Sequence, residues 1–405
     1  MLLISKYRNI FGEYISPVLI LLIGLSIGLL PLFFYKKSTH QLIKLNSNKP
    51  WQLAACIILA TFGFFEIYEL CKQIFNNYPI SVQISDIIPL LQVMVNRVEH
   101  LWYPYKPFSD FGYELFPTYL PAQWAPFVIA QKFHWGYRET ATIILFLSLA
   151  YLFYYVIKAQ ALTFIEKLSL IAFPIVGIYT FILYDNINVG VSIEQMIMGY
   201  YILLCTTLVM QKNIYIRSFA IVLCLLSRFS LLFWVPIFLY SVYIFEGKKN
   251  LKRAVGFIFL SLMIFYVLPF LIRDPFIFLK AQKAYTIAAL GEWDRKPSPH
   301  LQNGLGMAIY FVDFIKGDNL NKLRILQFTM LGLSLITMII LGIFLNKRQE
   351  RLNIGIFNIA SLKIILSIFY AFVQVPYSYL YFVPLGVSAV VLFAAINQKF
   401  VIRNS

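Results

Sequence analysis

Residues 14–35 read YISPVLILLIGLSIGLLPLFFY, an apolar run without a single charged side chain. An α-helix needs about 20 apolar residues to cross the ~30 Å hydrocarbon core of a bilayer. The run is too long for the apolar core of a signal peptide, and it has no convincing small-residue cleavage site. It therefore predicts a membrane-spanning helix.

The rest of the chain repeats this pattern. Of its 405 residues, 60% are hydrophobic and only 13% are charged, whereas soluble domains carry about 25% charged residues. We expect an all-α, polytopic membrane protein of about 11 transmembrane helices, within a range of roughly 10–12. The predicted spans are 14–35, 51–70, 138–158, 165–184, 190–210, 214–228, 230–245, 254–271, 323–345, 352–372 and 378–396.

Two segments between these spans are too long to be turns. Residues 71–137 and 272–322 are predicted to form large outer loops that contain short interfacial helices, the first of them the candidate catalytic loop. Residues 1–50 are expected to add an N-terminal helix and a cytoplasmic loop. No linker divides the chain, so we expect one transmembrane domain over 1–405.

The charges predict an orientation. The chain has 34 Lys and Arg against 18 Asp and Glu, a net charge of +16. Basic residues gather in the short loops, which places those loops in the cytoplasm and the N-terminus outside. On that layout Glu166, Glu246 and Glu350 are the cytoplasmic acids, and the other acids lie outside or in the outer part of a span. The basic excess is therefore a topology signal, and no nucleic-acid partner is expected.

The first outer segment holds the densest set of polar groups. Residues 84–102 carry apolar side chains at helical spacing, which predicts an amphipathic helix in the interface. Asp86 stands at its start, as either a catalytic carboxylate near the membrane or an ordinary helix N-cap. Glu99 and His100 are a second candidate pair, with an exposed helix face as the alternative. A further short apolar helix is predicted to end near Phe133.

Several short motifs carry a resemblance to a known family. They are Asp86 shortly after a span, Tyr103-Pro104-Tyr105, Phe116-Pro117-Thr118-Tyr119-Leu120-Pro121, Asp185-Asn186-Ile187-Asn188 and Leu226-Ser227-Arg228-Phe229-Ser230. Together with the loop 272–322, they make residues 51–396 resemble the GT-C glycosyltransferases. The chain looks most like the polyprenyl-phosphate-sugar-dependent mannosyltransferases of glycosyltransferase family 87. It departs from them at Tyr377-Ser378-Tyr379, where that family more often has His-Tyr.

The resemblance implies transfer of mannose, or another hexose or pentose, from a polyprenyl-phosphate donor to a hydroxyl of a lipid-linked or glycan acceptor. Such a reaction needs a general base and cations at the departing phosphate. The resemblance gives the base role to Asp86. The substrate-binding candidates are Glu99, His100, Tyr105, Lys106, Tyr119, Arg228, Arg273 and His300. The expected location is a bacterial inner membrane, among its lipids, with the site on the periplasmic face.

The basic candidates each have an alternative role. Arg228 lies between two apolar spans with no acid within ten residues of it in the sequence. A guanidinium at membrane depth is costly unless it meets an anion or snorkels to the interface, and both interpretations stay open. Arg273 and His300 belong to a basic outer segment that suits phosphate contact, although a solvated or interfacial loop has the same composition.

No cofactor is expected. The four cysteines have no C-x-x-C spacing, and the four histidines form no zinc motif. The chain has no Walker A motif and no G-x-G-x-x-G after a strand. No metal site is predicted, although carboxylates that recruit a divalent cation stay open.

Two other functions compete with glycosyl transfer. A membrane transporter favours charges at mid-membrane and repeated halves, and only Lys363 and Arg228 suggest such depth. An O-antigen ligase or polymerase-type enzyme of envelope polysaccharides also has large outer loops. Such an enzyme is expected to depend on Arg and His rather than on an Asp after an early span.

Overall fold

A computed structural model describes residues 10–34, 49–112, 115–159 and 162–396. The predictions for 1–9, for the loop 35–48 and for the tail 397–405 lie outside these ranges. Within them the β-type pairing is one isolated bridge between Phe108 and Leu115. The helices are α2 (Gly12–Phe34), α3 (Pro50–Asn77), α4 (Ile87–Glu99), α5 (Pro121–Lys132), α6 (Tyr137–Lys158), α7 (Phe164–Tyr184), α8 (Asn186–Val191), α9 (Glu194–Met210), α10 (Ile214–Leu225), η1 (Phe229–Phe233), α11 (Val235–Leu262), η2 (Met263–Leu271), α12 (Ile277–Asp294), α13 (Ala308–Phe314), α14 (Asn319–Arg348), α15 (Ile354–Ala371), η3 (Ser378–Tyr381) and α16 (Phe382–Ile396).

The described residues contain eight helices that are long and apolar enough to cross a membrane. They are α2, α3, α6, α7, α11 continued by η2, α14, α15 and η3 continued by α16. The prediction of an α-helical polytopic membrane protein is confirmed at this level. Two further apolar helices, α9 and α10, are shorter.

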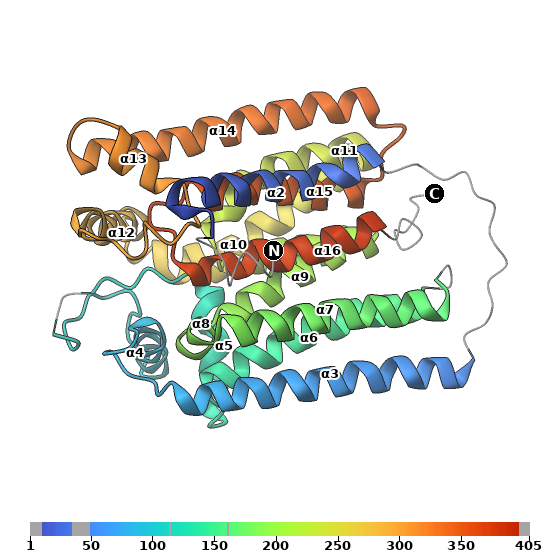
Figure 1. The fold of residues 1–405 in the computed structure, drawn as a ribbon, viewed down its shortest axis with the longest axis horizontal. Coiled ribbons are helices and arrows are strands. Elements are labelled where there is room, and N and C mark those ends of the chain that lie inside the picture. The colour runs from blue at the N-terminus through green and yellow to red at the C-terminus, as the bar shows by residue number, and fades with distance from the viewer. Residues whose placement is uncertain (1–9, 35–48, 113–114, 160–161, 397–405) are drawn as a thin grey trace.

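The long helices lie side by side, and the short ones gather at one end of the bundle (Figure 1). We call this the short-helix end; it holds α4, α5, α8, α12 and α13. There α4 and α12 run across the direction of the long helices, so they are seen nearly end-on. The predicted helices of the first outer segment are present as α4 and α5. The segment predicted as the second outer loop contains α12 and α13.

The centre of the bundle is α15, whose residues are almost all buried. Its sequence is apolar on every side, and a helix of that kind is stable only when neighbours surround it. The helix α2 approaches α15 closely at Gly24 and Gly28. A Cβ built on Gly24 would lie 2.6 Å from Ser367 Oγ, and one on Gly28 would lie 2.6 Å from Ile364 Cγ1. Small residues at this spacing let two membrane helices touch backbone to backbone.

Some predicted boundaries differ from the structure. The predicted span 190–210 is divided, since α8 ends at Val191 and α9 begins at Glu194. The helix α3 continues to Asn77, past the predicted end at 70, because its last turns bury Ile74 and Phe75.

The region predicted as the spans 230–245 and 254–271 is helical over Val235–Leu271, as two helices that meet at a kink. Gly247 interrupts it, with φ 81° and ψ 175°, in a region that favours glycine. Glu246 bonds to Arg217 of α10, while Phe270 packs on Tyr105 at the short-helix end. The break at Gly247 therefore replaces the predicted loop at 246–253.

Candidate functional site

Asp86 lies directly before the first residue of α4. It occupies the N-cap position, but its carboxylate makes no capping hydrogen bond to that helix. The backbone N–H of Ile87 instead donates to Ser85 Oγ at 3.3 Å. The Asp86 side chain is partly buried.

Tyr119 lies in the connection that enters α5, and several charged side chains act on the pKa of its phenol. Burial and then the Asp86 carboxylate raise the pKa of Tyr119 above its ordinary value, and the Arg228 guanidinium acts in the opposite direction. Glu194 acts on the same phenol. Coulomb interactions of this kind fall off with distance, so the fold places Asp86 and Arg228 near one aromatic side chain.

Arg228 follows α10 and forms an ion pair with Glu194, the first residue of α9. The side chains are 18% and 4% exposed. The two residues are 34 positions apart, which is why no acid near Arg228 is visible in the sequence. Simple snorkelling is therefore not the role of Arg228. Glu194 was missed, although a carboxylate inside the predicted span 190–210 is itself a functional signal.

Several buried polar atoms around this pair make no hydrogen bond with the described residues. They are Glu194 Oε2, Gln195 Oε1, Arg228 Nε and the Tyr370 hydroxyl. Unsatisfied polar atoms are rare in protein interiors because each one costs about 1–3 kcal/mol. Their gathering beside an ion pair is the pattern expected where a polar ligand or ordered water binds.

Tyrosines from four segments surround the charges; we call Tyr119, Tyr285, Tyr370, Tyr377 and Tyr379 the tyrosine cluster. Tyr377 and Tyr379 stack with ring centroids 5.5 Å apart, and the His300 ring meets Tyr377 edge-on at 4.7 Å. Burial raises the pKa of Tyr377, and Tyr285, Glu292 and Asp86 act in the same direction. His300 thus contacts a tyrosine on whose pKa the Asp86 carboxylate also acts.

A short hydrogen-bond network holds η3 against the start of α8. Asn188 Nδ2 donates to Asp185 Oδ1 at 2.6 Å and to Ser378 Oγ at 2.7 Å. The motif Asp185-Asn186-Ile187-Asn188 therefore fixes the segment that carries Tyr377 and Tyr379. Its role in this chain is to position part of the tyrosine cluster.

Glu99 and His100 lie at the opposite end of α4 from Asp86. A helix of 13 residues is about 20 Å long at 1.5 Å per residue. Gln131 Nε2 donates to Glu99 Oε2 at 2.5 Å, and His100 Nδ1 lies 2.8 Å from the carbonyl oxygen of Asn96. Glu99 therefore ties α4 to α5, while His100 contacts the last turn of its own helix, at the end away from Asp86.

Three more candidates belong to an aromatic cluster beside η2. Tyr105 is buried, accepts a hydrogen bond from Trp124 Nε1 at 3.3 Å and packs on Phe270. Arg273 places its guanidinium 4.8 Å from the centre of the Tyr103 ring. Lys106 is exposed, and its carbonyl oxygen accepts from Arg97. These contacts hold the loop after α4 in place, and none of them involves a residue of the tyrosine cluster.

No group of three or more His, Cys, Asp or Glu suited to a metal ion occurs within the described ranges. The four cysteines are buried and unpaired. The polar groups of the candidate site are carboxylates, a guanidinium, phenols and an imidazole.

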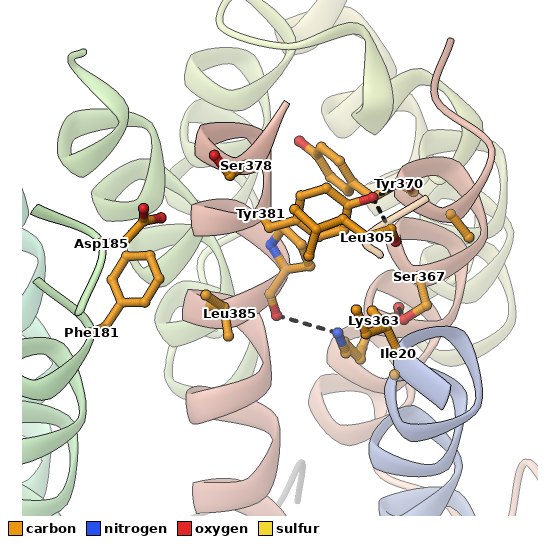
Figure 2. Close-up of a pocket in the computed structure, with 13 residues that line it drawn as sticks. Ile20, Phe181, Asp185, Leu305, Lys363, Ser367, Tyr370, Ser378, Tyr381 and Leu385 are labelled. Carbon is orange, nitrogen blue, oxygen red and sulfur yellow. Dashed lines mark hydrogen bonds between the residues drawn. The ribbon is translucent and has the colours of Figure 1, made fainter. Parts of the chain in front are cut away.

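The bundle also contains two cavities. One, of about 50 Å³, lies between α2, α7, α15 and α16, and Figure 2 shows Asp185 and Lys363 on opposite sides of it. The other, of about 180 Å³, lies between α6, α7, α9 and α16 and is lined almost wholly by apolar side chains. Neither is lined by Asp86 or Arg228, but the smaller cavity adjoins the tyrosine cluster, because Tyr370 lines it.

Comparison of the chain with protein-family models, curated proteins and solved structures finds no match.

Proposed function

We propose that this chain is an inverting membrane glycosyltransferase of the GT-C type. It moves a sugar from a polyprenyl-phosphate donor to a hydroxyl of a lipid-linked or glycan acceptor. The observation that supports this most is that the charges of Asp86 and Arg228 both act on the Tyr119 phenol. Glycosyl transfer needs a carboxylate that accepts a proton and a cation that meets a leaving phosphate, both at one place.

In the proposed reaction the acceptor hydroxyl oxygen attacks the anomeric carbon while Asp86 accepts its proton. The bond from that carbon to the phosphate oxygen breaks on the opposite face. The phosphate leaves with the electron pair, and the configuration at the carbon inverts. Arg228 neutralises the charge that grows on the phosphate, and Glu194 holds the guanidinium in place.

The proposal includes a topology of eleven spans with the N-terminus and the short-helix end outside a bacterial inner membrane. Two short helices, α9 and α10, add to the eight long ones, and the break at Gly247 divides one of these into two. Loops at the opposite end of the bundle carry many of the basic residues, as the positive-inside rule favours.

The test is an Asp86→Asn variant, purified in lipid and assayed with a panel of polyprenyl-phosphate sugars. The amide keeps the size of the side chain but cannot accept the proton, so we expect transfer to fall by roughly 100-fold or more. Radiolabelled sugar recovered in the acceptor measures the rate. The thermal unfolding midpoint shows that the variant is folded.

Asp110→Asn is the matched control, since Asp110 is an exposed carboxylate of the same loop region. We expect it to keep the wild-type rate. Full activity of Asp86→Asn would remove Asp86 as the base. Loss in both variants would instead point to damage to the loop.

Transport is the second candidate, and Lys363, buried in the middle of α15, is the observation that favours it. Uptake of a labelled sugar phosphate into sealed proteoliposomes, without formation of a new glycosidic bond, would support transport and contradict glycosyl transfer.

A further inference from the structure

Lys363 is a buried cation of α15, the helix that also carries Tyr370 of the tyrosine cluster. It is 1% exposed and lies near the midpoint of α15, the most enclosed helix of the bundle. Its Nζ donates to the carbonyl oxygen of Pro384 at 3.2 Å. Among the described residues no carboxylate forms an ion pair with it, and its interacting titratable neighbour is the Cys205 thiol.

Two other enclosed cations have a carboxylate partner, whereas Arg138 and Lys167 donate to backbone carbonyl oxygens. Arg217 pairs with Glu246 at 2.7 Å, and Arg228 pairs with Glu194. Lys167 donates to the carbonyl oxygen of Ile157 at 2.7 Å, near the end of α6. A charge taken out of water without a partner costs several kcal/mol. The ammonium of Lys363 has three protons, and one backbone carbonyl compensates only part of its charge.

A cavity lies directly beside this ammonium (Figure 2). Its volume is about 50 Å³, and a water molecule needs roughly 10–15 Å³ when volume is measured in this way. Gly24 of α2 keeps the space open. A Cβ there would lie 3.7 Å from Lys363 Nζ and 2.6 Å from Ser367 Oγ. The cavity therefore combines one buried cation, one nearby hydroxyl and room for a small group.

We propose that this cavity binds a small monovalent anion of about the size of chloride. Lys363 supplies both the charge and the N–H donors, because the single proton of the Ser367 hydroxyl is already donated to the carbonyl oxygen of Lys363 at 2.8 Å. Asp185 lines the other side of the cavity, so repulsion from its carboxylate places the anion at the Lys363 side. The site does not depend on the proposed glycosyl transfer.

An anion held there stabilises the packing of α2 on α15 and α16. Binding to the folded state alone raises the free energy of unfolding with the logarithm of the anion concentration. At 100 times the dissociation constant the gain is about 2.7 kcal/mol. The stability of the protein is therefore expected to depend on chloride.

The experiment measures the thermal unfolding midpoint of the full chain in nanodiscs of zwitterionic lipid. Chloride replaces gluconate at constant ionic strength, and bromide is tested in the same way. We expect the midpoint of the wild type to rise saturably by a few degrees. Lys363→Met, which keeps the length of the side chain without its charge, is expected to lose this response.

Lys167→Met is the matched control, because it also removes a buried lysine but leaves the cavity intact. It is expected to keep the chloride response. Gly24→Ala keeps Lys363 but narrows the cavity, so it is expected to weaken the response. If Lys363→Met does not fold, the chloride response of Gly24→Ala tests the proposal in its place.

Three results would overturn the proposal. They are a wild type that does not respond to chloride, a Lys363→Met variant that responds like the wild type, and a Gly24→Ala variant with an unchanged response. A midpoint that follows anionic lipid at fixed chloride would assign the ammonium to a lipid headgroup, which also contradicts a free-anion site.

Discussion

At the scale of single residues, the ion pair of Arg228 and Glu194 shapes the candidate site. It holds a guanidinium near Tyr119 and Asp86. A buried ion pair adds little net stability, but removing one partner leaves the other charge uncompensated. The unsatisfied Arg228 Nε and Glu194 Oε2 show that the pair has hydrogen-bonding capacity left for a ligand.

We predict that Glu194→Gln lowers the free energy of unfolding by about 3 kcal/mol, because breaking a buried pair typically costs 3–5 kcal/mol. Arg228 also loses the group that orients it, so donor binding is expected to weaken. Thermal unfolding and equilibrium binding of a polyprenyl-phosphate sugar measure the two effects.

Glu246→Gln provides the comparison, since it breaks the pair with Arg217 at the opposite end of the bundle. It should lower stability and leave donor affinity unchanged. Equal effects of both variants on donor affinity would contradict a specific role for Glu194.

At the scale of elements, α4 and α5 form a tied pair at the short-helix end. Gln131 joins them, since it donates to Glu99 at 2.5 Å and accepts from the Tyr137 hydroxyl at 2.7 Å. Each helix is followed by a non-glycine residue with positive φ, Leu101 at 59° and His134 at 56°. Exposed aromatic and apolar side chains surround these ends: Leu101, Trp102, Ile129, Phe133 and Trp135.

We predict that these helix ends lie in the membrane interface, where tryptophan is favoured. Trp102 is 64% exposed and Trp135 is 55% exposed. Lipids brominated near the headgroup are expected to quench the fluorescence of both residues. Trp102→Phe and Trp135→Phe should each reduce the quenched fraction.

Trp293→Phe is the control, because Trp293 is 1% exposed and its Nε1 donates to the carbonyl oxygen of Gln374. Trp293→Phe should lower the total fluorescence without changing the amount of fluorescence that the brominated lipids quench. Equal quenching losses in all three variants would show that the ends of α4 and α5 are not at the interface.

At the scale of the whole molecule, the bundle has two unlike ends (Figure 1). The short-helix end carries the tyrosine cluster and many of the acids. The other end carries basic connections, such as those near Lys158 and Arg348. Polar groups concentrated at one end place the proposed chemistry at one membrane face, because the long helices between the ends are apolar.

We predict that Asp110→Cys reacts with a membrane-impermeant maleimide in intact cells, whereas Gln349→Cys reacts only after the cells are opened. Both positions are exposed, and they lie at opposite ends of the bundle. The four native cysteines are buried, so background labelling should be low. Labelling of position 349 alone in intact cells would invert the proposed topology.

The sequence alone predicted the helical class, the long apolar helices and the two short helices α4 and α5. These features depend on local patterns, namely apolar length and helical spacing, which neighbouring residues determine. Predicted boundaries were wrong where packing overrides the pattern. The end of α3 is one example, since the burial of Phe75 extends the helix past its apolar core.

Only the tertiary structure decided which polar residues act together. It joined Arg228 to Glu194, packed His300 on Tyr377, and left Glu99 at the far end of α4 from Asp86. It also placed a cavity beside Lys363. The reason is physical: apolar length specifies that a helix spans the membrane, while the identity of its neighbours depends on side-chain packing between segments far apart in the chain.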